Sequence, residues 1–172
     1  MTQRDRRQEI LDRLWDLFKD LTVDLAGGPN GASQIKPGSV VRNRNDLQAD
    51  KVPGIILLDA DEVKDPRALR PPPGVQQTRM PAQIMRMTPE IYVVLDVRGV
   101  KNENVGKDLN TARLAILNAI MTDDQLQSIV GSNGDITYDG CVTDLARNRT
   151  MKGQLGISVT FTYPLIVKEF VG

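Results

Sequence analysis

The stretch that decides the fold is PEIYVVLDVRGVKNENVGKDLNTARLAILNAIM, residues 89–121. Its first part predicts a packed β-strand, because β-branched and aromatic residues dominate and side chains alternate between two faces. Its last part, from Leu109, predicts a buried helix, because apolar residues recur at spacings of three and four. We expect a polar loop over residues 100–108. A central strand followed by a helix that lies back across the sheet would then organise the rest of the chain. The strand's first face holds Ile91, Val93, Leu95 and Val97.

The flanking sequence adds elements in an order that does not alternate strand and helix regularly. Before the central strand, the pattern predicts an opening helix that ends at a GGPNG loop, followed by three strands, the last of which leads into the central strand. After the buried helix, it predicts a short helix and two closing strands, with a possible bulge at Gly140. This order favours a single α+β domain over residues 1–172, with a mainly antiparallel β-sheet and helices packed on one face. The closing strands are expected to form an extended β-hairpin. The expected helices cover residues 4–25, 109–121 and 123–130, and the expected strands cover 39–42, 51–59, 82–88, 91–97, 135–142 and 156–163.

Composition excludes several classes of function. The 172 residues carry 22 basic and 22 acidic side chains, so the chain lacks the basic surplus of a general nucleic-acid binder. No apolar run approaches the length of a membrane span, and the charged start MTQRDRRQ does not resemble a signal peptide. Histidine is absent, which removes the commonest general base and metal ligand at neutral pH.

The remaining candidates for chemistry are weak. Cys141 is the sole cysteine, and its strand pattern predicts a small core residue more readily than a nucleophile. An acidic cluster, Asp59, Asp61, Glu62 and Asp65, follows a predicted strand and could hold Mg²⁺ or Ca²⁺, but a face that is solvated or pairs with the proline-rich arm is the simpler interpretation. The GGPNG loop lacks the Lys-Ser/Thr of a phosphate-binding loop. We expect no cofactor, no metal and no enzymatic activity.

Residues 60–88 form an unusually long proline-rich excursion. Consecutive prolines favour the extended polyproline II conformation, which is stiff and easily docked. Two interpretations stay open, a mobile surface loop and an arm that reaches a neighbouring subunit, and the apolar residues near its end favour the arm. The candidate contact residues here are Arg67, Arg70, Pro71, Pro72, Pro73, Arg79, Met85 and Met87.

Three further features suggest contacts between subunits. The loop 143–153 carries Arg147, Arg149 and Lys152, and it is either a simple connection or a finger that meets an acidic protein surface or DNA phosphates. Ser158, Thr160 and Thr162 form a strand face with no obvious helix to cover it. Trp15 lies beside the apolar stripe of the first helix, where it either covers the core or contacts a partner.

The ordered set of segments resembles tail terminator and tail-completion proteins, minor tail proteins of long-tailed bacteriophages. The similarity covers about residues 4–165 and lies in pattern and order. After the opening helix it includes LLDADE, MTPEIYVVLDVRG, NVGKDLNTARLAILNAIMTDDQL, GSNGDITYDGCVTDLA and GQLGISVTFTYPL.

The resemblance implies a structural virion protein that forms a hexameric ring. Such a ring caps the tail tube, stops its polymerisation and presents a surface to the head-side connector or neck protein, with DNA passing through the lumen. It implies assembly in the bacterial host cytoplasm and a final position at the head-proximal end of the tail. The span 60–88 looks long for this family. The alternatives are a neck or head–tail connector ring subunit and, from a different class, a metal-dependent hydrolase using Asp59, Asp61 and Glu62.

Overall fold

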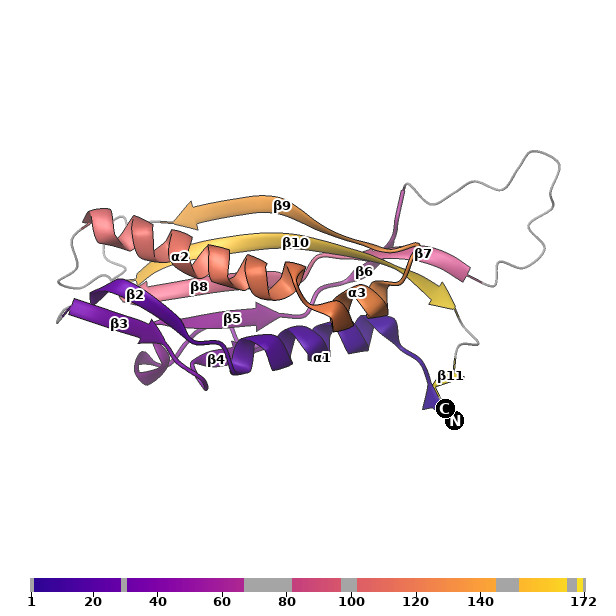
Figure 1. Cartoon of the computed structure of the whole chain (residues 1–172), viewed down its shortest axis with the longest axis horizontal. Helices are drawn as coiled ribbons and strands as arrows, with labels where there is room; N and C mark the ends of the chain where they lie inside the picture. The colour runs from indigo at the N-terminus through magenta and orange to yellow at the C-terminus, as the bar shows by residue number, and fades with distance from the viewer. Residues whose placement is uncertain are drawn as a thin grey trace.

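The computed structural model describes residues 2–28, 31–66, 82–96, 102–144, 152–166 and 170–171. They form an elongated α+β structure in which a layer of helices lies in front of a curved sheet (Figure 1). Its elements are β1 Thr2–Gln3, α1 Arg6–Lys19, β2 Val23–Gly28, β3 Gly31–Ile35, β4 Val40–Arg42, a 3₁₀ turn Ala49–Lys51, β5 Gly54–Leu58, β6 Glu62–Lys64, β7 Ala82–Met87, β8 Glu90–Asp96, α2 Asn102–Met121, α3 Asp124–Val130, β9 Asp135–Asp144, β10 Lys152–Ile166 and β11 Phe170–Val171.

The centre of the sheet is the antiparallel pairing of β10 with β7 and β8. Met87 pairs with Phe161 and Glu90 pairs with Ser158, so one register continues across the break between β7 and β8. The break contains Pro89, which has no backbone N–H to donate to the ladder. Strands β7 and β8 therefore act as one long strand with a local interruption.

Other strands flank this central pair on both sides. Strand β5 pairs antiparallel with β8, β6 pairs antiparallel with β7, and β4 pairs parallel with β5. Strand β9 pairs antiparallel with the other side of β10. The sheet is thus mixed but mainly antiparallel, as the sequence predicts, with β9 along one side and β4 and β6 along the other (Figure 1).

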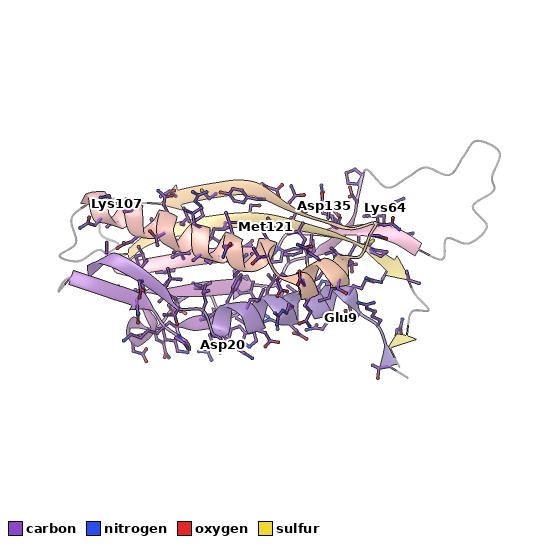
Figure 2. The ribbon with its side chains drawn as sticks, viewed as in Figure 1. Glu9, Asp20, Lys64, Lys107, Met121 and Asp135 are labelled. Carbon is purple, nitrogen blue, oxygen red and sulfur yellow. The ribbon has the colours of Figure 1, made fainter. Side chains whose placement is uncertain are left out.

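All three described helices pack on one face of the sheet. Alternate residues of β10, from Leu155 to Tyr163, point to this face and join one continuous core with the helices. Helix α1 begins at the N-cap Asp5, whose side chain accepts a hydrogen bond from the backbone of Gln8. Charged residues such as Lys107 occupy the outward faces of the helices (Figure 2). The helix residues in the core are Ile10, Leu11, Leu14, Phe18, Val105, Leu109, Ala112, Ile116, Ile120, Leu126, Ile129 and Val130.

A second, smaller apolar cluster lies on the opposite face of the sheet. It consists of Val41, Leu47, Ile56 and Val94, with Tyr92 packed against it. Because Ile55 and Leu57 point into the main core, β5 is buried on both faces. This confirms the interpretation of the GIILLD run as a strand that is covered on both sides.

The opening helix is shorter than predicted. It ends at Lys19 instead of near residue 25, and Val23–Gly28 forms β2, which pairs with β3. The helical spacing appeared to continue because Leu21 packs against the core and Leu25 is buried, but Val23, Leu25 and Ile35 reach the core from a two-stranded sheet. The predicted loop after the helix is therefore part of a β-structure, although residues 29–30 lie outside the described residues.

Helix α2 begins earlier than predicted. Asn102–Asp108 is helical, where a polar loop was expected. Val105 is buried, and the buried carboxylate of Asp108 accepts hydrogen bonds from the backbone N–H groups of Ala26 and Gly27, at 2.8 and 3.0 Å. The polar residue that suggested a loop thus joins α2 to β2.

The bulge predicted at Gly140 is present, and it changes the expected environment of Cys141. Gly140 has a φ of 128°, and the pairing of β9 with β10 shifts register between Ser158 and Val159. Cys141 is exposed, so its prediction as a core residue was wrong. It belongs to the outermost strand of the sheet beyond this bulge, and the helices that cover β10 do not cover it.

The connection between the last two long strands is also shorter than predicted. Thr143 and Asp144 belong to β9, while Lys152 and Gly153 belong to β10. The pairing of the two strands is antiparallel. Residues 145–151, with Arg147 and Arg149, lie outside the described residues.

Candidate functional site

Several predicted contact residues lie outside the described residues, namely Arg67, Arg70, Pro71, Pro72, Pro73 and Arg79. Met85 and Met87 are described, in β7. Met87 is 1% exposed, so it belongs to the core of the subunit and not to its surface, and its prediction as a surface contact was wrong. Met85 is partly buried against the main core. Both methionines alternate with Ile84 and Arg86 along β7 and pair with Tyr163 and Phe161, which places them on the helix side.

Ser158 and Thr160 lie on the face of the sheet opposite the helices, as predicted. Both are half-buried, and the Thr160 hydroxyl lies 2.8 Å from the hydroxyl of Thr88 and also bonds the carboxylate of Asp139. Thr162 points to the same face but is only 4% exposed, so its prediction as a surface contact was wrong. Its hydroxyl lies under the start of β9, near the backbone oxygen of Asp135.

A shallow hollow of about 550 Å³ occupies the middle of this helix-free face. Tyr92 is opposite Gly156 in the register, and a Cβ on Gly156 would lie 3.2 Å from the ring of Tyr92. The ring therefore lies over the glycine. The neighbouring Val142, paired with Gly156 from the other side, is 76% exposed. An aromatic ring and an exposed aliphatic side chain thus form an apolar floor.

Acidic groups border this hollow. Glu90 and Asp139 contribute to its lining, and no basic side chain is among its described lining residues. The Tyr92 hydroxyl donates a hydrogen bond to Glu90 at 2.9 Å, and this bond, together with partial burial, raises the pKa of Tyr92. The bond also holds the ring and the carboxylate together at one end of the hollow.

A second hollow of about 500 Å³ adjoins the first, and the two share Thr88 and Asp139. Its lining includes Asp61, the exposed Val63 and Arg86. Together the described lining of the two hollows carries three carboxylates and one guanidinium group. The helix-free face is therefore apolar at its floor and acidic at its margins.

The outer side of β9 continues this face to an open edge. Within the described part of the chain β9 pairs only with β10, which leaves one side of its backbone without a partner strand. Asp135 and Asp139 lie along it, and both are exposed. Charged residues on an edge strand oppose indiscriminate strand pairing. A specific contact at this edge would have to accommodate these carboxylates.

The acidic cluster after β5 is used within the subunit. Arg42 binds both carboxylate oxygens of Asp59, at 3.0 and 3.1 Å, and also contacts Asp12 at 2.9 Å. Burial disfavours the ionised form of Asp59, but the hydrogen bonds from Arg42 and Asn43 outweigh it and lower its pKa. No group of three potential ligands in the described ranges is arranged to hold a metal ion. Asp59, the first carboxylate of the candidate metal site, is thus held in an ion pair within the subunit.

Glu62 takes part in a buried polar group that sequence reasoning missed. The hydroxyl of Tyr163, one oxygen of Glu62 and Nε of Arg7 are buried, and none of these atoms makes a hydrogen bond with a described residue. The other end of Arg7 donates to the backbone oxygen of Ala60 at 2.7 Å. Burial, followed by the charge of Glu62, raises the pKa of Tyr163 well above its usual range. Three distant segments meet here, so no local pattern could reveal the group.

Trp15 and its neighbour Arg13 have structural roles. Trp15 is partly buried against the main core, which matches the interpretation of Trp15 as a cover for the core. Arg13 binds both oxygens of Asp123, at 3.0 and 2.6 Å, and thereby joins α1 to the start of α3.

No helix in the described part of the chain is long and apolar enough to cross a membrane. A comparison of the chain with protein-family models and with curated proteins finds no match.

Proposed function

We propose that this chain is a structural virion protein, the subunit of a ring that caps the tail tube of a long-tailed bacteriophage as a tail terminator. The observation that carries the proposal is the segregation of all described helices to one face of the sheet, which leaves the opposite face with two adjoining hollows and an exposed Val142. A subunit with a large uncovered sheet face has a surface available for a neighbour. The resemblance of the sequence to tail terminator proteins supplies the particle in which that neighbour is found.

A closed ring requires two different patches on each subunit, because a ring contact is heterologous. The helix-free face is one candidate patch, and the proline-rich segment supplies a second. The equal numbers of acidic and basic residues limit repulsion between identical copies. A stable ring contact should bury on the order of 1,000 Å² or more.

In this role the ring contacts the tail tube protein on one side and the head-side connector or neck protein on the other. Arg147 and Arg149 lie in sequence between the last two long strands, and Lys152 is the first residue of β10. These three basic residues would meet either an acidic tube surface or DNA in the lumen. The site of action is the head-proximal end of the tail, after assembly in the host cytoplasm.

A neck or head–tail connector ring is the second candidate, since it needs the same kind of subunit surface. Only its position in the particle distinguishes it from a terminator. The hydrolase alternative has less support, because Asp59 is paired with Arg42 and one carboxylate oxygen of Glu62 is buried. Loss of a Mg²⁺-dependent activity on Asp61→Asn would revive that alternative.

The test is to interrupt the gene for this chain in the phage that carries it and to examine the particles by electron microscopy. The expected result is tails of abnormal length that do not join heads, restored when the chain is supplied in trans. A structure of the normal virion should show the chain as a ring between tube and neck. Tails of normal length, or a chain found outside a ring, would overturn the proposal.

A further inference from the structure

The hollow around Tyr92 has a chemistry that suits a particular occupant. Its floor combines the Tyr92 ring, Gly156 and the exposed Val142, and its margin carries Glu90 and Asp139. Proline-rich segments dock in grooves lined by aromatic rings, because a polyproline II helix is already stiff and loses little entropy on binding. Adjacent carboxylates select segments in which arginine accompanies proline.

The chain itself contains one such segment. Residues 67–81 read RALRPPPGVQQTRMP, with three arginines, four prolines and no acidic residue. This segment lies outside the described residues. Its charge is opposite to that of the hollow, where the described lining includes two acidic residues and no basic one.

The segment of the same chain is too short to place its Arg-Pro junction on Tyr92. The backbone of Asp65 pairs with that of Ile84, and Ile84 and Tyr92 are separated by eight residues of the β7–β8 strand, or about 26 Å. Arg70 and Pro71 follow Asp65 by only five and six residues, which span at most about 18 and 22 Å. They can reach the near margin of the hollow at Thr88 and Glu90, but not Tyr92. A second copy supplies a segment that can lay this junction across Tyr92 and Val142.

We propose that the helix-free hollow formed by Tyr92, Val142, Glu90 and Asp139 binds the Arg- and Pro-rich segment 67–81 of a second copy of this chain. The prolines pack against Tyr92 and Val142, and the arginines pair with Glu90 and Asp139. This inference rests on the proposed ring, for which it names the two patches that meet. Each copy then offers one hollow and one segment, which is the heterologous arrangement that closes a ring.

The test is disulfide trapping between two purified variants of the full chain. Both carry Cys141→Ser, one adds Leu69→Cys and the other adds Val142→Cys. Leu69 follows Asp65 by four residues, about 13 Å at full extension, so it cannot reach Val142 of its own chain. Mild oxidation of the mixture should give a cross-linked product of two chains, each of 19.0 kDa.

Matched controls separate docking from random collision. Leu114 is 58% exposed on the helix side, so Leu114→Cys replaces Val142→Cys at a comparable surface outside the hollow and should cross-link at least about fivefold less. Glu90→Gln with Asp139→Asn, both at exposed positions, should lower the yield with Val142→Cys and reduce its dependence on salt. Equal yields at positions 142 and 114 would overturn the inference.

The outcome is independent of the proposed tail function. A specific cross-link together with normal tails in the gene-interruption experiment would leave the docking in place and remove the terminator role. No specific cross-link together with a ring seen in the virion would remove the docking and leave the terminator role.

Discussion

At the scale of single residues, the clearest exception to ordinary packing is the Tyr163 hydroxyl. Tyr163 is 1% exposed, and its hydroxyl has no hydrogen-bond partner among the described residues. A buried hydroxyl without a partner costs about 1–3 kcal/mol of desolvation. We predict that Tyr163→Phe leaves the free energy of unfolding unchanged or raises it by about 1 kcal/mol, measured by urea denaturation.

The matched control for that variant is Tyr138→Phe. The Tyr138 hydroxyl accepts a hydrogen bond from Arg113 at 3.2 Å, so its removal should lower stability by roughly 0.5–1.5 kcal/mol. A larger loss of stability for Tyr163→Phe than for Tyr138→Phe would show that the Tyr163 hydroxyl is hydrogen-bonded in the folded protein.

The same residue predicts a pH dependence. Because the folded-state pKa of Tyr163 is raised, the unfolded chain loses this proton near pH 10 while the folded chain retains it. The free energy of unfolding is therefore unaffected by this titration below about pH 10. Above about pH 10 it declines by up to about 1.4 kcal/mol per pH unit, because only the unfolded chain releases the proton. We expect Tyr163→Phe to show a shallower alkaline loss of stability in denaturation series from pH 8 to 11. Parallel curves for the two proteins would show that Tyr163 does not titrate differently on unfolding.

At the scale of elements, Asp123 joins two helices. Its side chain caps α3 by accepting from the backbone of Leu126 at 2.8 Å, and it binds Arg13 of α1. The hydrogen bond from Arg13 is the largest cause of its lowered pKa. We predict that Asp123→Ala costs about 2 kcal/mol of stability, while Asp123→Ser retains the cap and costs about half as much. Equal losses for both variants in thermal or urea denaturation would assign the whole effect to the ion pair.

The sign of the acid dependence follows from the lowered pKa. The stabilisation from Asp123 is present above the pKa of an unfolded aspartate, about 3.9, and is lost as the pH falls through the lower folded value. Asp123→Ser should therefore differ most from the original protein at neutral pH and least in strong acid.

Elements with an internal period could be predicted from sequence, and elements defined by distant contacts could not. The alternation in β8 and β10 and the spacing in α3 are local properties, and the structure confirms all three. Strand β2 and the first turns of α2 depend on each other through Asp108, and the local sequence does not contain that contact. Without that contact, the polar residues in the first turns of α2 have the sequence pattern of a loop.

The same distinction applies to the candidate site. Alternation in β10 correctly placed Ser158 and Thr160 on the helix-free face. The hollow itself needs Tyr92, Gly156 and Val142 side by side from three strands, and this requires the register of the sheet. The exposure of Cys141 likewise depends on its place in the outermost strand, which the strand pattern alone did not supply.

At the scale of the whole molecule, Val142 and Leu114 are the two most exposed of the large apolar side chains in the described residues, and they allow a comparison of the two faces. Both are highly exposed, at 76% and 58%, so a single aspartate at either position should change the free energy of unfolding by less than about 0.5 kcal/mol. The two variants should therefore have matching circular dichroism spectra and melting temperatures. Any difference in assembly between the two variants then shows which face of the subunit contacts a neighbour, and it does not reflect a difference in folding.

We predict that Val142→Asp prevents ring formation and that Leu114→Asp does not. In the assembled ring Val142 would be covered by a neighbour beside Glu90 and Asp139, so a further carboxylate there would be buried among like charges and cost several kcal/mol per contact. A ring repeats that cost at every contact, which makes its assembly more sensitive than a single docking event. The measurement is the fraction of particles with joined tails of normal length when each variant complements the interrupted gene. Normal particles with Val142→Asp, or a defect of equal size with Leu114→Asp, would place the contact between subunits away from the helix-free face.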